Sequence, residues 1–431
     1  MDTTRSPAPR LPGRADVEAA ARALAPVFAP TPLQRHPRLS AATGLDVWLK
    51  REDLQPVRSY KARGAFTVVA GLDDAQRAVG VTCASAGNHA QGVALACARA
   101  GVRARIFLPR TTPRQKRERV AALGGHLVEV VITGDTYDEA AEAAASYAGT
   151  SGAVVVPAFD DPAVVAGQGT VTLEVLAQLQ AEAGRVPDLL LLPVGGGGLI
   201  AGAVAALADR ADVRLAGVEP AGAASMAAAV AAGAPVTLEE IDGFVDGAAV
   251  RRVGSVTHAV VAAAAITPHL TTVPEGRVCV EMLELYQADG IVAEPAGALA
   301  TAALPTVAAD LGLAPGSTVV CVLSGGNNDV SRYAEVVERA LVYEGRKHYF
   351  LVDFPQEPGA LRRFLDEVLG PDDDITLFEY VKRNNRETGP ALVGVELSDP
   401  DDLAGLHARM EESPLRVEQV PPDSPLFRFL L

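Results

Sequence analysis

Strand-like and helix-like segments alternate along most of the chain, and this alternation limits the possible folds more than any other feature. Short apolar segments precede alanine- and leucine-rich segments of helical length, as in 79–84 before 87–100 and 189–194 before 199–208. Such units form right-handed crossovers onto parallel sheets whose two faces are covered by helices. The pattern predicts an α/β fold with two layered lobes in residues 15–340, because one open sheet rarely takes this many strands.

A different order begins near residue 347. Strand, helix, two strands, helix and strand follow one another over residues 347–421, which predicts a separate ferredoxin-like domain with both helices on one face of its sheet. Gly389-Pro390 predicts the hairpin between the two middle strands. At the other end, residues 1–14 are polar and broken by prolines, and they lack the apolar core of a secretory signal. We expect a short flexible arm there.

Composition excludes several classes of function. The formal net charge of -15 and the pI of about 5.0 repel the phosphates of nucleic acids and anionic lipid headgroups. The four cysteines are far apart, so we expect no disulfide framework and no metal site, and a reducing cytoplasm fits. An uncharged run at 189–208 is long enough for a membrane span, but Pro193 and four glycines interrupt it. It predicts strand, loop and helix, and no membrane partner.

Four consecutive glycines at 195–198 lie between an apolar strand and a helix. Backbone amides of glycines can surround an anion, and a helix N-terminus adds free N–H groups and a favourable dipole. The segment therefore predicts a phosphate site, with a ligand-free tight turn as the alternative. Gly196-x-Gly198-x-x-Ala201 also fits the relaxed dinucleotide fingerprint, and Glu219 ends the next strand, so NAD stays open as a second interpretation.

Lysine is scarce, because only five of the 38 Lys and Arg residues are lysines. Lys61 follows a predicted strand and begins a predicted apolar helix, at the edge of the sheet where ligands collect. Burial there would lower the pKa of its amine and favour Schiff-base chemistry. A solvated lysine in the first helical turn is the alternative.

Two further loops follow predicted strands. The segment 85–89 precedes a helix whose first amides can hold a carboxylate. Asn88 can offer its amide to a ring hydroxyl or simply cap that helix, and His89 is expected to be structural rather than a base. Ser324 ends another strand and is expected to face the same cleft, with a capping turn as the alternative. Glu294 repeats this placement with weaker specificity.

The motifs SYKARGA, SAGNHAQG, VGGGGL and SGGNND follow in this order over residues 59–329 and resemble those of the fold-type II pyridoxal-phosphate enzymes, most closely the biosynthetic threonine dehydratases. The resemblance implies that pyridoxal 5'-phosphate is the cofactor, bound to Lys61 as a Schiff base. It also implies that Asn88 contacts the ring hydroxyl and that Ser324 faces the pyridine nitrogen. The phosphate would be bound by Gly195, Gly196, Gly197, Gly198 and Leu199, and the substrate carboxylate by Ser85, Ala86, Gly87, Asn88 and His89.

The reaction implied by this resemblance is the deamination of L-threonine to 2-oxobutanoate and ammonia by β-elimination of water, the first step of isoleucine biosynthesis. L-Serine is a second candidate substrate. A serine dehydratase or another lyase of this fold, a non-enzymatic amino-acid sensor and an NAD enzyme remain as alternatives. Serine racemases of the same fold carry a second serine where Ala86 stands here, so we expect little racemisation.

The segment from Tyr343 to about Val420 resembles the single ACT-like regulatory domain of the short biosynthetic form. By this resemblance Pro358, Gly359, Ala360 and Leu361 form an effector loop, with isoleucine as the inhibitor. A plain helix start is the alternative. Small domains of this kind pair through their sheet edges, so we expect a homo-oligomer, either a dimer or a tetramer.

Overall fold

The computed structural model describes residues 10–382, 385–422 and 424–430. The chain forms two compact units. The first contains the chain up to Glu275 together with Leu285–Asn328, and the second contains Gly276–Glu284 together with Asp329–Leu431. Each unit has its own hydrophobic core.

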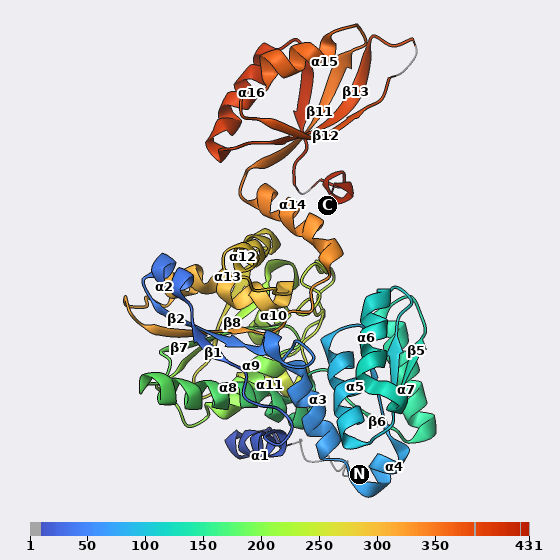
Figure 1. Ribbon diagram of the computed structural model, residues 1–431, viewed down its shortest axis with the longest axis vertical. Coiled ribbons are helices and arrows are strands. Elements are labelled where there is room, and N and C mark those ends of the chain that lie inside the picture. Colours follow the sequence, from blue (N-terminus) through green and yellow to red (C-terminus); the bar gives the residue numbers. More distant parts are fainter. Residues whose placement is uncertain (1–9, 383–384, 423, 431) are drawn as a thin grey trace, which may run out of the picture. The chain divides into compact units, whose positions relative to one another are not determined.

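The larger sheet of the first unit has the strands β1 (Leu33–Arg35), β2 (Asp46–Arg51), β7 (Leu189–Pro193), β8 (Arg214–Pro220), β9 (His269–Val273) and β10 (Thr318–Leu323). Their order is β1-β2-β10-β7-β8-β9, and all neighbours are parallel except β1, which is antiparallel to β2. Helix α13 (Pro295–Asp310) covers one face, and α8 (Pro162–Ala183) and α9 (Gly198–Ala206) cover the other (Figure 1). Because both faces are covered, β7 and β10 can be unbroken apolar runs.

The smaller sheet consists of β3 (Val81–Ala84), β4 (Ala104–Leu108), β5 (Val128–Ile132) and β6 (Val154–Val155). Its order is β5-β4-β3-β6, and every pair is parallel. Helices α5 (Asn88–Ala100) and α7 (Tyr137–Ser151) lie on opposite faces of this sheet (Figure 1), and α3 (Lys61–Ala70) packs on α5. The two sheets are the two predicted lobes.

The remaining helices of this part of the chain are α1 (Arg14–Leu24), α2 (Pro37–Thr43), α4 (Asp74–Val79), α6 (Arg114–Gly124), α10 (Ser225–Ala232), α11 (Ser255–Ala262) and α12 (Glu275–Gln287). Helix α12 is shared. Its first residue, Glu275, and its end from Leu285 belong to the first unit, while the residues between them belong to the second.

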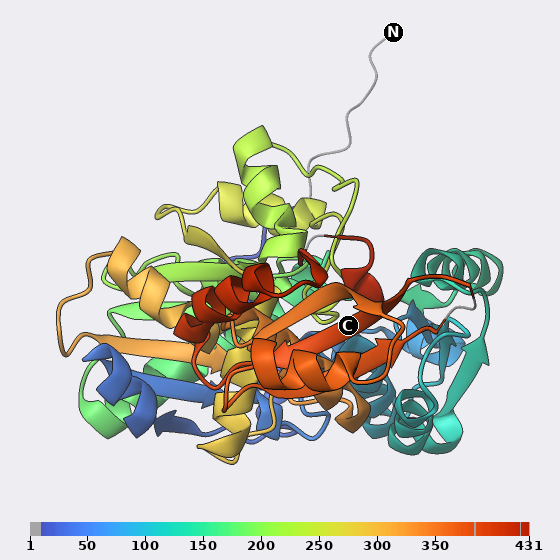
Figure 2. The ribbon, with the colours of Figure 1, turned by 90° about the horizontal axis from the view of Figure 1, so that it is seen from above.

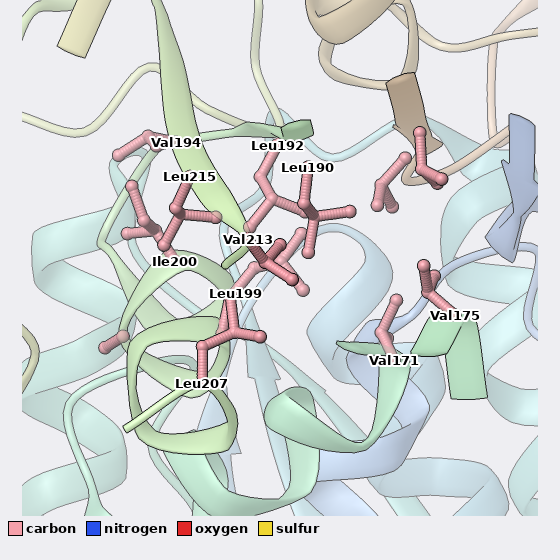
Figure 3. Packing of buried hydrophobic residues seen from close by; sticks show 14 of the residues in the cluster. Val171, Val175, Leu190, Leu192, Val194, Leu199, Ile200, Leu207, Val213 and Leu215 are labelled. Carbon is pink, nitrogen blue, oxygen red and sulfur yellow. The ribbon is translucent and has the colours of Figure 1, made fainter. Parts of the chain in front are cut away.

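Leucine, isoleucine and valine side chains of β7, α8 and α9 form the core of the larger lobe. Leu190 and Leu192 of β7 face Val171 and Val175 of α8 (Figure 3), and all four are at most 1% exposed. Burying one such side chain is worth about 1.5–3 kcal/mol relative to leaving it in water. This packing fixes the end of β7, and with it the glycine loop that leads into α9.

The second unit has the strands β11 (Lys347–Pro355), β12 (Asp374–Tyr380), β13 (Thr388–Glu396) and β14 (Arg416–Gln419), all antiparallel in the order β12-β13-β11-β14. Helix α14 (Tyr333–Tyr343) precedes them. Helices α15 (Ala360–Arg363) and α16 (Leu403–Glu412), coloured orange and red, lie over the same sheet (Figures 1 and 2). Phe350, Phe364 and Leu406 meet in the core between the helices and the sheet.

The two parallel lobes and the βαββαβ unit confirm the predicted fold class. Three strands were not predicted: β1 and β6 are very short, and β9 has the sequence HLTTV without an apolar run. Helix α1 begins at Arg14, the last residue of the segment expected to be an arm, whose residues 1–9 lie outside the described residues. In the described part of the chain, no helix is long and apolar enough to cross a membrane.

The prediction of a hairpin at Gly389-Pro390 is wrong. Both residues lie inside β13, opposite Phe354 and Asp353 of β11. Pro390 has no N–H to donate. Its carbonyl accepts from the Val381 N–H, one residue beyond the end of β12. The missing donor therefore lies where the hydrogen bonds between β12 and β13 end, and a proline is tolerated there. The connection between the two strands instead runs from the end of β12 to Thr388.

Candidate active site

The first unit contains a cleft of about 620 Å³ at the carboxyl ends of β3 and β7. All four sequence motifs contribute to its lining: Lys61, the loop 85–89, the segment 195–199, and Asn327 of the fourth motif. In α/β folds, ligands bind at this end of parallel strands, where the loops that follow them converge. The fold therefore brings together residues that are more than 130 positions apart in the sequence.

Lys61 is the first residue of α3, and two close helix contacts fix where α3 lies. A methyl group on Gly92 of α5 would be 3.2 Å from the Lys61 carbonyl oxygen. On the other side, a methyl group on Gly167 of α8 would be 2.7 Å from Gly64 Cα. Glycines at both contacts let α5 and α8 hold α3 between them, and this holds the Lys61 side chain at the cleft.

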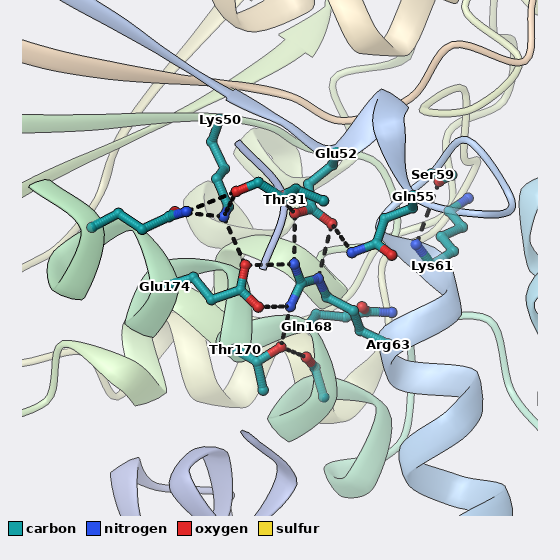
Figure 4. A network of polar contacts seen from close by, with 12 residues as sticks. Thr31, Lys50, Glu52, Gln55, Ser59, Lys61, Arg63, Gln168, Thr170 and Glu174 are labelled. Carbon is teal, nitrogen blue, oxygen red and sulfur yellow. Dashed lines mark hydrogen bonds and ion pairs between the residues drawn. The ribbon is translucent and has the colours of Figure 1, made fainter. Parts of the chain in front are cut away.

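A buried ionic network anchors the same end of α3 (Figure 4). The Arg63 guanidinium, 1% exposed, lies 2.7 Å from Glu52 and 2.6 Å from Glu174. Lys50 Nζ lies 2.7 Å from Glu174. The two carboxylates are thus balanced by two cations. Removing any one of these four side chains would leave a buried charge without compensation. The network lies two residues along the helix from Lys61.

Burial lowers the pKa of the Lys61 amine, and the carboxylates of Glu294 and Asp246 oppose this shift. The Lys61 backbone N–H donates to Ser59 Oγ at 3.4 Å, and the side chain lines the cleft. A lowered pKa increases the fraction of neutral amine, the form that attacks a carbonyl or accepts a proton. The surroundings of Lys61 therefore differ from those of a solvated lysine in an exposed turn.

The loop that precedes α9 needs glycines because its neighbours leave no room for side chains. A methyl group on Gly196 would be 2.3 Å from the ring of Phe159, and one on Gly197, where φ is +93°, would be 2.4 Å from Met226 Cε. Helix α9 begins directly afterwards with no acidic residue in its first turn, and first-turn N–H groups have no acceptors within a helix. Because the loop lines the cleft, these free N–H groups are suited to bind an anion such as phosphate.

In the loop 85–89, the Gly87 N–H donates to Ser85 Oγ at 3.2 Å. His89 Nε2 lies 2.8 Å from the Val156 carbonyl oxygen, and burial lowers the pKa of His89 to about 4. The ring is therefore neutral near pH 7 and carries its hydrogen on Nε2, since a carbonyl can only accept. This agrees with the expectation that His89 is structural, and it leaves the loop without a positive charge from this ring.

Ser324, which was predicted to face the cofactor ring, does not line the cleft. Its side chain is 2% exposed, and its hydroxyl donates to the Ala296 carbonyl at 3.2 Å. A buried hydroxyl needs such a partner, and the carbonyl is the acceptor at hand. Two residues near it, Asn327 and Glu294, line the cleft instead.

Several cleft residues were not identified from the sequence. Lys116 Nζ of α6 lies 3.1 Å from Asp246 Oδ2, and both residues line the cleft together with Phe159. Arg251 lines it as well and donates to the Glu239 carbonyl at 2.6 Å. Lys116 could have been suspected from the scarcity of lysine, whereas the others lie in segments without a motif. Their positions depend on how the loops pack in the folded chain.

The NAD interpretation of the glycine loop is wrong. It requires the Glu219 carboxylate to be open to a ribose, but this side chain is fully buried and does not line the cleft. Its two oxygens accept from the N–H groups of Met226 and Ala227 at 2.6 and 2.8 Å. Glu219 thus caps the start of α10, and burial raises its pKa to about 7.

The predicted effector residues lie in the second unit, at the turn into α15. Gly359 has φ +88° and precedes the helix, Ala360 is buried, and Leu361 is 42% exposed. Helix α15 has only four residues. The turn has the geometry of a helix start that a glycine makes possible, and by itself it does not distinguish an effector loop from that alternative.

The two lobes and the lysine facing a glycine loop across their cleft are the architecture of a pyridoxal-phosphate-dependent enzyme. Residues 24–325 match the family model for pyridoxal-phosphate dependent enzymes, and residues 338–430 match the model for the C-terminal regulatory domain of threonine dehydratase. Pyridoxal phosphate is therefore the cofactor of this chain.

Relatives narrow the family further. The chain is 60% identical to the biosynthetic L-threonine dehydratase of Mycobacterium tuberculosis, over 97% of this chain and 96% of the relative. It is 54% identical to that of Corynebacterium glutamicum, over 96% and 94% of the two chains. The processed form of threonine deaminase isoform 2 from Solanum lycopersicum has a similar structure, with a TM-score of 0.71, 34% identity, and 79% and 93% of the two chains covered. The chain belongs to the biosynthetic L-threonine dehydratases.

Proposed function

We propose that this chain deaminates L-threonine to 2-oxobutanoate and ammonia, as a threonine ammonia-lyase in the pathway to isoleucine. The observation that carries the proposal is that Lys61 and the glycine loop before α9 line one cleft of about 620 Å³. L-Threonine is proposed as the substrate because relatives up to 60% identical to this chain are named L-threonine dehydratases. L-Serine, which has the same β-hydroxyl group, is the second candidate substrate.

The described residues fit pyridoxal phosphate, because Lys61 and the glycine loop line the same cleft, and a loop without side chains at Gly196 and Gly197 lets its backbone approach an anion. The phosphate would be held by the segment 195–199, the cofactor's aldehyde carbon by Lys61, and its ring hydroxyl by Asn88. Ser324 would face the ring nitrogen after turning its hydroxyl from the Ala296 carbonyl. When bound, pyridoxal phosphate withdraws electrons from the substrate's Cα and so eases loss of the Cα proton and the β-hydroxyl.

The chain's own residues would bind the substrate and move one proton. The first amides of α5 in the loop 85–89 would hold the carboxylate of threonine, which fixes its Cα relative to Lys61. The neutral amine of Lys61 would take the Cα proton, and the β-hydroxyl would leave as water. Hydrolysis of the C–N bond takes up one water, so the products are 2-oxobutanoate and ammonia. Ala86, which lines the cleft, has no proton to give to the opposite face, and this argues against racemisation.

The division of the chain is part of the proposal. A catalytic domain would occupy residues 15–340, and a regulatory domain would occupy residues 347–421, inhibited by isoleucine through the turn at 358–361. The match to a threonine dehydratase regulatory domain at residues 338–430 supports this division. Pairing of sheet edges would give a homodimer or tetramer, and a biosynthetic enzyme of this kind would work in the cytoplasm.

The test is a visible absorption spectrum of the purified chain, followed by addition of L-threonine and an assay for 2-oxobutanoate in the same cuvette. We expect a Schiff-base band that changes on addition while 2-oxobutanoate accumulates. Lys61→Ala should lose the band and the turnover, whereas Lys382→Ala, which changes an exposed lysine of the second unit, should keep both. A wild-type chain that stays colourless and inert after reconstitution would overturn the proposal.

A further inference from the structure

Three side chains that line the cleft are joined in a row of hydrogen bonds. Asn88 Nδ2 donates to Glu294 Oε1 at 2.7 Å, and Asn327 Nδ2 donates to Asn88 Oδ1 at 2.8 Å. The same Asn327 nitrogen donates to the Val57 carbonyl at 2.7 Å. The row therefore runs from a backbone carbonyl, through two amides, to a carboxylate.

The direction of each hydrogen bond follows from the two ends of the row. A backbone carbonyl can only accept, so Asn327 must turn its amino group toward Val57 and thereby toward Asn88. Asn88 then faces Asn327 with its oxygen and Glu294 with its nitrogen, which a carboxylate can accept. Neither amide could be flipped without placing two donors or two acceptors against each other. Asn88 is thus held in one orientation from both sides.

The Glu294 carboxylate is built into this place. It is 5% exposed and does not cap α13, although it occupies the position before that helix. A methyl group on Gly325 would be 2.2 Å from Glu294 Oε1, and one on Gly247 would be 3.6 Å away. The glycine after Ser324 therefore leaves the space that this carboxylate occupies.

We propose that Glu294 and Asn327 are positioning residues, which hold the Asn88 amide so that its second N–H donates to the ring hydroxyl oxygen of the cofactor. This inference rests on the proposed function, because it requires pyridoxal phosphate in the cleft. Glu294 engages one hydrogen of Asn88 Nδ2, and in the described part of the chain the other has no partner. A donor at that point stabilises the ionised ring oxygen and lowers its pKa.

The test measures cofactor binding and the titration of the cofactor's visible band, and it does not depend on turnover. Glu294→Leu and Asn327→Leu remove the two ends of the row independently, and each should weaken pyridoxal-phosphate affinity by about tenfold. Each should also move the pH at which the visible band titrates, because the ring oxygen loses its fixed donor. Glu294→Gln keeps an oxygen that can accept from Asn88, so its affinity should stay within about threefold of wild type. Glu219→Gln removes another buried carboxyl that does not line the cleft, and it should leave the band unchanged.

Unchanged affinity and unchanged band titration in both leucine variants would overturn this inference alone. A Glu294→Gln variant as impaired as Glu294→Leu would also overturn it. The charge of Glu294, and not its hydrogen bond from Asn88, would then determine cofactor binding. A wild-type chain that binds no pyridoxal phosphate would overturn the proposed function and this inference together. Far-ultraviolet circular dichroism of each variant separates lost cofactor contact from lost fold.

Discussion

A methyl group on Gly276 would lie 2.4 Å from Tyr343 Cβ, so α12 and α14 approach each other at a glycine within the second unit. One residue earlier, Glu275 Oε1 accepts from the Gly222 N–H at 2.8 Å within the first unit. The Gly222 carbonyl in turn accepts from Asp242, which begins the loop that lines the cleft up to residue 252. Consecutive residues of one helix thus connect the α12–α14 contact with the cleft loop.

Gly276→Ala should therefore weaken the inhibition by isoleucine that we propose for this chain. The added methyl group must displace Tyr343, and mutations between coupled sites typically change the coupling by about 2- to 30-fold. We expect the isoleucine concentration for half-inhibition to rise by an amount in that range, while threonine turnover without isoleucine stays near wild type. Tyr343→Gly, added to this variant, removes all three atoms that the methyl group would meet and should restore the response. Gly149→Ala, where nothing lies within 4 Å, is the control. Equal inhibition of the wild type and Gly276→Ala would contradict the coupling.

Gly196→Ala should weaken cofactor binding by at least about tenfold, because one lost charge-assisted phosphate contact is worth about 1.5–3 kcal/mol. The new methyl group would meet the Phe159 ring at 2.3 Å and push the loop out of place. Equilibrium dialysis with pyridoxal phosphate measures the change. Phe159→Ala in the same chain removes the clashing ring atoms and should recover part of the affinity. Wild-type affinity in Gly196→Ala would show that the loop does not hold the phosphate.

Arg63→Met should lower the free energy of unfolding by about 3–5 kcal/mol, since it leaves the buried carboxylate of Glu52 without its partner. Urea denaturation at neutral pH measures this. Arg114→Ala, which breaks an exposed pair with Glu118, is the matched change at the surface and should be indistinguishable from wild type. If the two variants lost equally little stability, the network around α3 would not be an anchor.

Glu219 makes the stability depend on pH in a definite direction. Burial raises its pKa to about 7, whereas an unfolded glutamate titrates near 4.3. The folded chain therefore binds this proton more tightly, and the contribution of Glu219 to stability falls as the pH rises through that window. Glu219→Gln removes this titration. As the pH rises from 5 to 8, the difference in free energy of unfolding between the variant and the wild type should therefore shift in favour of the variant by about 1–3 kcal/mol. Denaturation curves at both pH values check this, with the exposed Glu142→Gln as a control that should show no such trend.

Most of the fold could be predicted because the local patterns of its main strands and helices agree with the structure. The run from Leu189 to Pro193 is apolar throughout, and it became a central strand buried on both faces. Lys61 and the glycines at 195–198 could be recognised because each stands at the junction of a strand and a helix, where the chemistry of the residue and its place in the sheet coincide. The prediction of a hairpin at Gly389-Pro390 failed because both residues favour turns, and the sequence does not show that they pair with β11.

The residues that were missed depend on contacts between distant parts of the chain. Phe159 shapes the glycine loop from a segment with no motif of its own. Glu294 and Asn327 were noted only as parts of loops, and their role depends on meeting Asn88, more than 200 positions away in the sequence. The direction of that hydrogen-bond row follows from the Val57 carbonyl, a backbone atom that no sequence pattern marks.

The way in which helix α12 is shared has a consequence for the gene. The second unit is encoded by two separate stretches, because residues 276–284 belong to it while 285–328 return to the first unit. A chimera that exchanges only the continuous C-terminal stretch with a relative would combine one parent's α14 with the other parent's α12. Recombination that preserves the α12–α14 contact must therefore carry residues 276–284 of the donor along with its C-terminal segment, so that the glycine at 276 and the aromatic residue at 343 are inherited as a pair.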